Sequence, residues 1–375
     1  MKIGITCYPT YGGSGVVATE LGKALAEKGH EVHFISYAFP HRLRHFIDNI
    51  YYHEVEISNY PLFEHSLYSL SLTSKMLEVI EYENLDLMHV HYAIPHATSA
   101  YLAKQIIRKN NSDIKIITTL HGTDITLVGL EPSFLPLVKF SIEESDGVTA
   151  VSKFLRETTL TNYSISKDIE VINNFIDTSL FTDKKNEVMR KKIAPNGERI
   201  LIHTSNFRVV KRVTDTIRIL AIVKKEIPTK LILVGDGPDR SECERLSREL
   251  GLQDDVIFLG KQDGLEEILT CGDIFLMPSQ SESFGLAALE AMSCGLPIVS
   301  SSVGGLPELN HHNNTGFIAE FGDVKRMAKY TISLLQNDKK YNIFAKNARA
   351  RAVENFDINL IIPKYEKYYN KVINS

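Results

Sequence analysis

The sequence has little of what marks an exported or disulfide-bonded protein. Its 375 residues contain no tryptophan and four cysteines, which are Cys7, Cys243, Cys271 and Cys294. These cysteines lie far apart, without a Cys-x-x-Cys pair or a nearby histidine at ligand spacing, so they are not expected to form disulfides or a structural zinc site. We predict four buried, unreactive thiols.

Long apolar runs and a large charge of one sign are also missing. The first apolar run ends at Pro9 and Gly12, so it is neither a secretory signal nor a membrane span of about 18 residues. The net charge of −4 gives no electrostatic reason to expect a nucleic acid as partner. We expect a cytoplasmic protein that has no integral membrane segment and binds no nucleic acid.

The chain instead contains a regular alternation of short β-branched runs and longer amphipathic segments. In the first half, the strand-like runs are residues 2–7, 31–36, 87–91, 114–119 and 147–151. The helix-like segments are residues 16–28, 71–83, 95–108 and 136–144. Such an alternation predicts a parallel sheet with helices on both of its faces.

The same alternation starts again after residue 186. Its strand-like runs are residues 200–204, 230–234, 256–259, 274–277 and 297–300. A length of 375 residues also fits two domains, at about 150 residues for each domain. We therefore predict an α/β protein with two doubly wound, Rossmann-like domains.

Two features place the predicted domain boundaries. Polar residues are concentrated in 161–167 and 183–197, which makes this region the candidate hinge. The apolar residues of 358–372 recur at helical spacing, so this segment is expected to pack on the first domain. The predicted domains are residues 1–165 together with 355–375, and residues 166–354.

A glycine-rich loop follows the first predicted strand. Gly12, Gly13 and Gly15 precede a helix, whose first N–H groups and positive end favour an anionic or polar ligand. The spacing also fits a loose dinucleotide fingerprint, which would indicate a nicotinamide-dependent dehydrogenase. In such enzymes an acidic residue at the end of the second strand binds the ribose, whereas here that strand ends at Ser36 and Tyr37. A dehydrogenase is therefore disfavoured, and a tight turn without a ligand remains the other alternative.

A second cluster of small residues lies in segment 281–297. It follows a predicted strand, and a helix begins near Gly285, so this helix also directs its N-terminus toward the edge of a sheet. Glu290 lies among alanine and leucine residues, which is an unusual setting for a solvated carboxylate. The segment predicts an anion site, with an ordinary surface glutamate as the alternative for Glu290.

The pattern E-S-F-G-L-x-x-L-E-A-M-x-x-G-x-P, which begins at Glu282, resembles the signature of retaining glycosyltransferases of family four. Further segments match that family in its own order, namely residues 12–13, 121–124, 151–152, 174–177, 234–238 and 304–308. The resemblance spans the chain and implies the GT-B fold, in which two Rossmann-like domains face each other across a cleft. No Asp-x-Asp motif is present, so we expect no essential metal and no other cofactor.

Within this family, residues 3–9, 91–97 and 205–212 resemble members that use L-malate as acceptor. This resemblance implies UDP-N-acetylglucosamine (UDP-GlcNAc) and L-malate as substrates, in the first step of bacillithiol biosynthesis. The alternatives are a family-four enzyme with another small acceptor and a UDP-sugar epimerase of the same fold. Homo-oligomer formation is left open.

The resemblance also implies a set of donor-binding residues, which are Gly13, Gly235, Gly237, Gln262, Asp263, Phe284, Gly285, Leu286 and Glu290. Glu290 is expected to accept hydrogen bonds from the ribose, and the N–H groups of 284–286 to bind the sugar and the diphosphate. Gly235 and Gly237 would allow the nucleotide to approach closely. Gln262 and Asp263 are candidates for the uracil edge.

The expected catalytic residues are Lys211, His121, Glu282, Asn206 and Arg208. Lys211 is the first candidate for the charge that develops on the departing phosphate. Glu282 is expected to bind a hydroxyl of the transferred sugar, and His121 to lie near its reacting carbon. Family members usually have an arginine where this chain has Asn206, so the second cation is either Arg208 or Arg212, or an amide replaces it.

A dicarboxylate acceptor needs hydrogen-bond donors and a cation from the first domain. The candidates are the N–H groups after Gly13, the hydroxyls of Ser14, Tyr92 and Thr119, and the guanidinium of Arg42 or Arg156.

Overall fold

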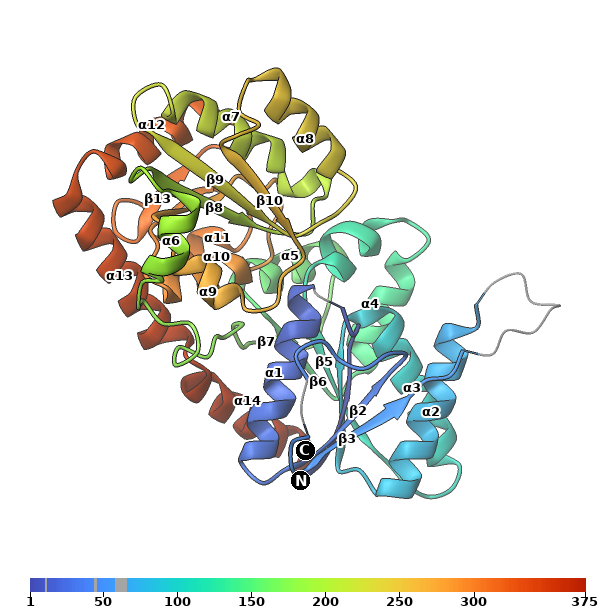
Figure 1. The fold of residues 1–375 in the computed structure, drawn as a ribbon. Coiled ribbons are helices and arrows are strands. Elements are labelled where there is room, and N and C mark those ends of the chain that lie inside the picture. The colour runs from blue at the N-terminus through green and yellow to red at the C-terminus, as the bar shows by residue number, and fades with distance from the viewer. Residues whose placement is uncertain (11, 44–45, 58–65) are drawn as a thin grey trace. The chain divides into compact units, whose positions relative to one another are not determined.

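The computed structural model describes residues 1–10, 12–43, 46–57 and 66–375, and its internal contacts divide the chain into two units (Figure 1). Unit 1 comprises Met1–Asn174 and Asn359–Ser375, and unit 2 comprises Phe175–Ile358. The polar stretches 161–167 and 183–197 therefore lie inside unit 1 and unit 2 respectively, and the chain passes between the units at 174/175. The boundary lies there because residues 170–171 still pair with the sheet of unit 1, whereas Ile176 pairs with Asp357 of unit 2.

Unit 1 is built on a seven-stranded parallel sheet with the order β3-β2-β1-β4-β5-β6-β7. The strands are β1 (Lys2–Thr6), β2 (Glu31–Ser36), β3 (Ile50–Glu54), β4 (Leu87–His91), β5 (Lys115–Leu120), β6 (Gly147–Ala150) and β7 (Glu170–Val171). The order reverses direction between β1 and β4, because the chain first adds β2 and β3 on one side and later β5 to β7 on the other. Such a reversal leaves a crevice at the carboxyl ends of the strands.

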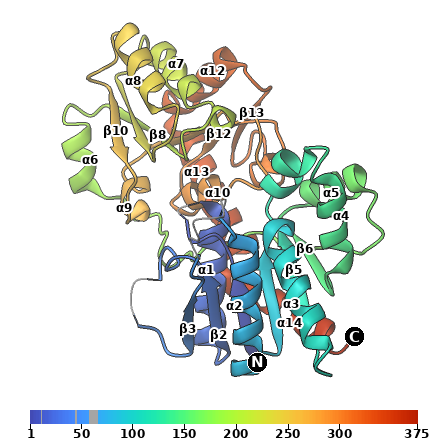
Figure 2. The same ribbon diagram turned by 90° about the vertical axis from the view of Figure 1, so that its right-hand side faces the viewer.

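Helices cover both faces of this sheet. They are α1 (Gly13–Glu27), α2 (Tyr68–Glu83), α3 (Thr98–Arg108), α4 (Leu135–Glu144), α5 (Lys153–Tyr163) and α14 (Ile358–Ile373). Figures 1 and 2 show α2 and α3 on one face and α1 on the other. Apolar residues of α2 and α3, such as Met76 and Ala103, form one buried cluster with Ile35 of β2 and Val90 of β4.

Unit 2 has a six-stranded parallel sheet with the order β10-β9-β8-β11-β12-β13, whose reversal lies between β8 and β11. The strands are β8 (Arg199–Thr204), β9 (Thr229–Val234), β10 (Val256–Gly260), β11 (Ile274–Met277), β12 (Ile298–Ser301) and β13 (Gly316–Ala319). The helices are α6 (Glu187–Ile193), α7 (Val213–Val223), α8 (Arg240–Glu249), α9 (Leu265–Leu269), α10 (Leu286–Ser293), α11 (Leu306–Leu309), α12 (Val324–Leu335) and α13 (Asp338–Phe356). Both units are therefore doubly wound, and the predicted fold class is confirmed.

Three strands were not predicted from the sequence. β3 is an edge strand whose residues Tyr51, Tyr52 and His53 are polar and mostly half-exposed, so it lacks the apolar alternation that marks a strand. β7 has only two residues, and β13 begins with a glycine. β3 was missed for want of apolar alternation, whereas β7 and β13 are short, with two and four residues.

Two further findings concern the cysteines and the helices of the described residues. All four cysteines are free and buried, as predicted. Among the helices of the described ranges, none has both the length and the apolar character that crossing a membrane requires.

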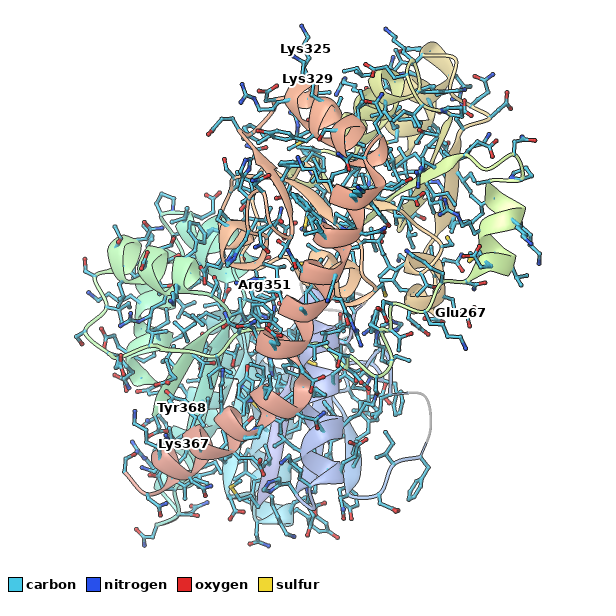
Figure 3. The ribbon with its side chains drawn as sticks, turned by 90° about the vertical axis from the view of Figure 1, so that its left-hand side faces the viewer. Glu267, Lys325, Lys329, Arg351, Lys367 and Tyr368 are labelled. Atoms are coloured by element: carbon cyan, nitrogen blue, oxygen red, sulfur yellow. The ribbon has the colours of Figure 1, made fainter. Side chains whose placement is uncertain are left out.

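The last helix, α14, belongs to unit 1, and Figure 3 shows Tyr368 on it. The hydroxyl of Tyr368 accepts a hydrogen bond from the Val148 N–H at 2.8 Å and donates one to the Val148 carbonyl at 3.1 Å. Tyr369 bonds through its hydroxyl to His89 Nδ1 at 2.7 Å. Because β7 pairs only with Thr149 and Ala150 of β6, Tyr368 takes the place of a strand partner for Val148.

We predict that Tyr368→Phe lowers the free energy of unfolding by about 1–3 kcal/mol, because it leaves two buried backbone groups of Val148 without a partner. Tyr82→Phe, at a position that is 82% exposed, is the control and is expected to change stability very little. Urea unfolding of both variants measures the difference. Equal stabilities would show that Val148 does not depend on the tyrosine hydroxyl.

Candidate functional site

In unit 2, two of the predicted catalytic residues meet at the reversal of strand order. Lys211 lies in the loop after β8 and Glu282 in the loop after β11, and Lys211 Nζ donates a hydrogen bond to Glu282 Oε1 at 2.5 Å. Ser279 donates to the same oxygen at 3.0 Å. The carboxylate of Glu282 is 9% exposed, so this ion pair is only partly screened by water. The structure thus brings together Lys211 and Glu282, which lie 71 residues apart in the sequence.

Two consecutive glycines hold the Glu282 loop in place. Gly304 has φ +59, and a Cβ atom there would lie 1.9 Å from the Glu282 carbonyl oxygen. A Cβ on Gly305 would lie 2.3 Å from the Ser283 carbonyl oxygen, and the Gly305 N–H donates to the Glu282 carbonyl at 2.9 Å. The match at residues 304–308 therefore has a structural reason, because only glycine permits this close approach.

The helix α10 begins where the sequence predicts it. Gly285 precedes the helix with φ +98, and the N–H of Leu289 bonds to the Gly285 carbonyl at 3.1 Å. The first N–H groups of the helix, from Leu286 onward, are thus directed to the carboxyl edge of the sheet. Glu290 is 4% exposed, which excludes the alternative of an ordinary surface glutamate. The Phe284 ring packs edge-on against Phe356 at 5.5 Å between ring centroids, so its side chain serves the core.

Gly235 and Gly237 make room for the protein's own backbone. A Cβ on Gly235, which has φ +120, would lie 1.8 Å from the Ser205 carbonyl oxygen. A Cβ on Gly237 would lie 2.6 Å from the Phe207 carbonyl oxygen. These glycines therefore hold the loop after β9 against the loop that leads to Lys211. Their contact with a nucleotide stays a prediction.

The candidates for a second cation differ in their surroundings. Arg212 Nε bonds to Asp215 at 2.7 Å, and its guanidinium lies 5.3 Å from the centroid of the Phe321 ring. Arg208 and Asn206 are exposed. The buried Asp215 pairs with both Arg212 and Arg218, so both Arg208 and Arg212 stay candidates for the second cation.

The uracil candidates, Gln262 and Asp263, are both exposed. The Gln262 amide donates to the Leu259 carbonyl of its own loop at 2.6 Å.

In unit 1, Ser14 and Tyr92 meet at the reversal between β1 and β4. Tyr92 follows β4 with φ +90, and its hydroxyl donates to Ser14 Oγ at 2.7 Å. Ser14 lies in the first turn of α1, next to the exposed Gly13. Two of the predicted acceptor residues are therefore in contact, at the N-terminus of a 15-residue helix.

Asp124 holds the loops around this point. Its carboxylate accepts the Ala93 N–H at 2.8 Å and the Gly122 N–H at 3.0 Å. Burial raises the pKa of Asp124 to about 6, although the hydrogen bonds from the backbone act in the opposite direction. One carboxylate thus connects the loop after β4 to the loop after β5.

His121 belongs to a connected group of histidines. His121 Nε2 lies 2.7 Å from His91 Nδ1, and His96 Nδ1 lies 2.5 Å from the His91 carbonyl oxygen. Because a carbonyl only accepts, His96 carries its proton on Nδ1, and its Nε2 accepts from the Tyr68 hydroxyl at 3.2 Å. Desolvation by the surrounding protein, and next the charge of His96, lower the pKa of His121 to about 3.

These histidines are neutral near pH 7, because desolvation also lowers the pKa of His96 to about 4 and that of His91 well below its usual value. His121 therefore offers a neutral ring, 5.3 Å from the Tyr92 ring between centroids. Sequence reasoning selected His121 but missed His91, His96 and Asp124. The alternation of His89 and His91 in one strand was the available signal, because alternate residues share a face of the sheet.

The remaining acceptor candidates are placed differently. The Thr119 hydroxyl is fully buried and bonds to His89 at 2.6 Å and to Thr149 at 2.7 Å. It lies inside the layer that supports the histidines rather than on a surface. Arg156 lies in the first turn of α5 and is 3.9 Å from Asp168. Arg42 is half-buried and has φ +72.

Two family models and a curated relative match this chain. The model of glycosyltransferase family 4 matches residues 11–180, and that of the glycosyl transferases group 1 matches residues 184–351. The N-acetyl-alpha-D-glucosaminyl L-malate synthase of Bacillus anthracis is 48% identical over 374 residues, which cover 100% of this chain and 97% of that protein. This chain belongs to glycosyltransferase family four.

Solved structures of similar fold include Anabaena HepE in complex with UDP and glucose. It has a TM-score of 0.82 and 21% identity, and the match covers 98% of each chain. Sucrose-phosphate synthase from Thermosynechococcus elongatus has a TM-score of 0.81 and 21% identity, over 100% of this chain and 99% of that chain. At this identity the likeness shows the fold, which is GT-B.

We predict that Gly304→Ala destabilises unit 2 by about 1–3 kcal/mol more than Gly322→Ala does. Both glycines have positive φ, but a Cβ on Gly322 would meet nothing within 4 Å, whereas one on Gly304 would overlap the Glu282 carbonyl. The two variants thus share the backbone strain and differ in the overlap. Chemical denaturation measures both, and equal losses would mean that the Glu282 loop adapts freely.

Proposed function

We propose that this protein transfers N-acetylglucosamine from UDP-GlcNAc to the hydroxyl of L-malate with retention of the anomeric configuration, as the first step of bacillithiol biosynthesis. The observation that carries the proposal is the 48% identity with the Bacillus anthracis synthase over the whole chain. The ion pair of Lys211 with Glu282 and the burial of Glu290 support it. Neither the epimerase nor the dehydrogenase alternative has a comparable observation in its favour.

In this proposal, Lys211 and the N-terminus of α10 bind the diphosphate of the donor. Negative charge grows on the departing phosphate as the glycosidic bond breaks, and preorganised cations and N–H dipoles stabilise that charge. The phosphate competes with Glu282 for Lys211, so donor binding weakens the 2.5 Å ion pair.

The two buried glutamates have separate roles. The hydrogen bonds described for Glu282 use Oε1, and we assign Oε2 to a hydroxyl of the transferred sugar. Glu290 accepts hydrogen bonds from the ribose hydroxyls, because a carboxylate accepts two neighbouring donors well. Its burial keeps competing water away from these bonds.

We assign the acceptor to unit 1. The Ser14 hydroxyl, which the hydrogen bond from Tyr92 positions, and the N–H groups after Gly13 provide donors for one carboxylate of malate, and Arg42 or Arg156 provides the cation. His121 contributes a neutral ring rather than a positive charge. The departing phosphate accepts the proton of the malate hydroxyl, so the proposed reaction needs no enzymic base, and Lys211 with the N-terminus of α10 takes the place of a divalent metal.

Incubation of the protein with UDP-GlcNAc and a panel of small hydroxy acids tests the proposal. Mass spectrometry is expected to detect the N-acetylglucosamine adduct of L-malate, together with one UDP for each adduct, and NMR is expected to show the retained anomer. Excess EDTA is expected to leave the initial rate at 25 °C unchanged. Release of UDP without an adduct would favour the epimerase, and equal reaction of neutral alcohols would exclude a malate-specific site.

We predict that Lys211→Ala and Glu290→Gln affect different constants. Loss of Lys211 removes charge stabilisation from the transition state, so kcat is expected to fall about 10²- to 10³-fold. Glu290→Gln removes charged hydrogen bonds to the ribose, so the Kd for UDP is expected to rise about tenfold to a hundredfold.

Steady-state kinetics and calorimetry with UDP distinguish the two effects. Lys225→Ala, at an exposed lysine of the same unit, is the matched control and is expected to behave as wild type. Unchanged kcat in Lys211→Ala, or unchanged UDP affinity in Glu290→Gln, would remove the role assigned to that residue.

A further inference from the structure

Three side chains outside the candidate site form a group with the composition of a metal site. His33 lies on β2, His53 on β3 and Glu83 at the end of α2. Each offers one ligand atom, and these atoms all lie within 4.8 Å of one another. Two imidazoles and one carboxylate are a common ligand set for zinc.

The sheet register brings the two histidines to the same face. His33 is paired with Tyr51, and His53 follows two residues later on the same strand, so all three side chains point to one side. The His33 ring stacks on Tyr51 at 4.8 Å and on His53 at 5.3 Å between centroids. His33 Nδ1 and His53 Nε2 are 3.0 Å apart and share one proton.

Glu83 reaches this face from the helix above it. Met76, Val79 and Ile80 are buried against the sheet from α2. Glu83 lies three, four and seven positions after Ile80, Val79 and Met76, and these spacings place it on the same side of the helix. The carboxylate is therefore directed to the layer between α2 and the strands β2 and β3.

Hydrogen bonding alone leaves His33 incompletely satisfied. The residue is 1% exposed, and its Nε2 has no hydrogen-bond partner among the described residues. Whichever ring carries the shared proton, one buried nitrogen of His33 is unpaired, and this costs stability. A buried imidazole is thus retained here at a cost in stability that the single bond to His53 offsets only in part.

We propose that His33, His53 and Glu83 bind one zinc ion, which cross-links the edge strand β3 to β2 and α2. Zinc takes the place of the proton shared by His33 Nδ1 and His53 Nε2, and that proton moves to the other nitrogen of its own ring, so both imidazoles stay neutral. Tetrahedral coordination with Zn–N bonds of about 2.0–2.1 Å separates two nitrogen ligands by about 3.3 Å. The observed 3.0 Å therefore requires only a small displacement. Glu83 is the third ligand and water the fourth.

This site is separate from the proposed reaction. α2 runs back toward the amino edge of the sheet, because β4 begins at Leu87, soon after α2 ends at Glu83. Ser14 and Tyr92 lie at the opposite, carboxyl edge. The zinc ion is accordingly assigned to stability, and the proposal stands whether or not malate is the acceptor.

Titration of the chelator-treated full chain with zinc chloride, followed by calorimetry, tests the proposal. One zinc ion per chain is expected to bind and to raise the Tm. His53→Gln and Glu83→Gln, which keep hydrogen-bonding groups of similar size, are expected to bind zinc at least tenfold more weakly. Magnesium is expected not to compete, because it prefers oxygen ligands.

His311→Gln is the matched control, since His311 is exposed and neighbours His312, a pair that offers metal another place to bind. Its zinc affinity is expected to equal that of wild type. Cobalt absorption bands in the visible range provide a second measurement on the unaltered protein, and they are expected to report nitrogen ligands in a four-coordinate site. Wild-type zinc affinity in both His53→Gln and Glu83→Gln, loss of binding in His311→Gln, or absence of the cobalt bands would overturn the proposal.

Discussion

The reversal of strand order is the constraint on which the rest of this structure depends. In each unit, consecutive strands are added first to one side of the starting strand and then to the other, so the loops after β1 and β4, and those after β8 and β11, diverge. The crevice between such loops exposes helix N-termini and strand ends, where backbone groups are unpaired. The Ser14–Tyr92 and Lys211–Glu282 contacts occupy these two places.

Sequence reasoning predicted most of the fold because buried parallel strands consist of short, continuous apolar runs. β2, β4 and β11 agree with the predicted ranges, and the neighbouring helices follow from amphipathic spacing. β3 was missed because its half-exposed residues do not form an apolar run. The start of α10 after Gly285 was also predictable, since a glycine directly before an alanine-rich segment is typical of a helix start. The burial of Glu290 was predictable from its alanine and leucine neighbours.

The partners within the site were less predictable. Gly235 was assigned to the nucleotide, but the atom that would collide with a side chain there is the carbonyl oxygen of Ser205, 30 positions earlier in the chain. A glycine in the sequence indicates a position with an unusual φ or a close neighbour, but it does not say which atom that neighbour is. Likewise, Asp124 connects two loops by accepting the N–H groups of Ala93 and Gly122. Nearly every residue has a backbone N–H, so the sequence does not show which of them Asp124 binds.

The packing of α14 on unit 1 has a consequence for how the chain is made. A ribosome produces the seven strands of unit 1 first, then all of unit 2, and only afterwards Tyr368 and Tyr369. Until then, Val148 and His89 lack the partners that the finished protein gives them. Unit 2 is therefore complete before unit 1 is. While the 184 residues of unit 2 emerge, the incomplete, exposed sheet of unit 1 has to be kept from aggregating.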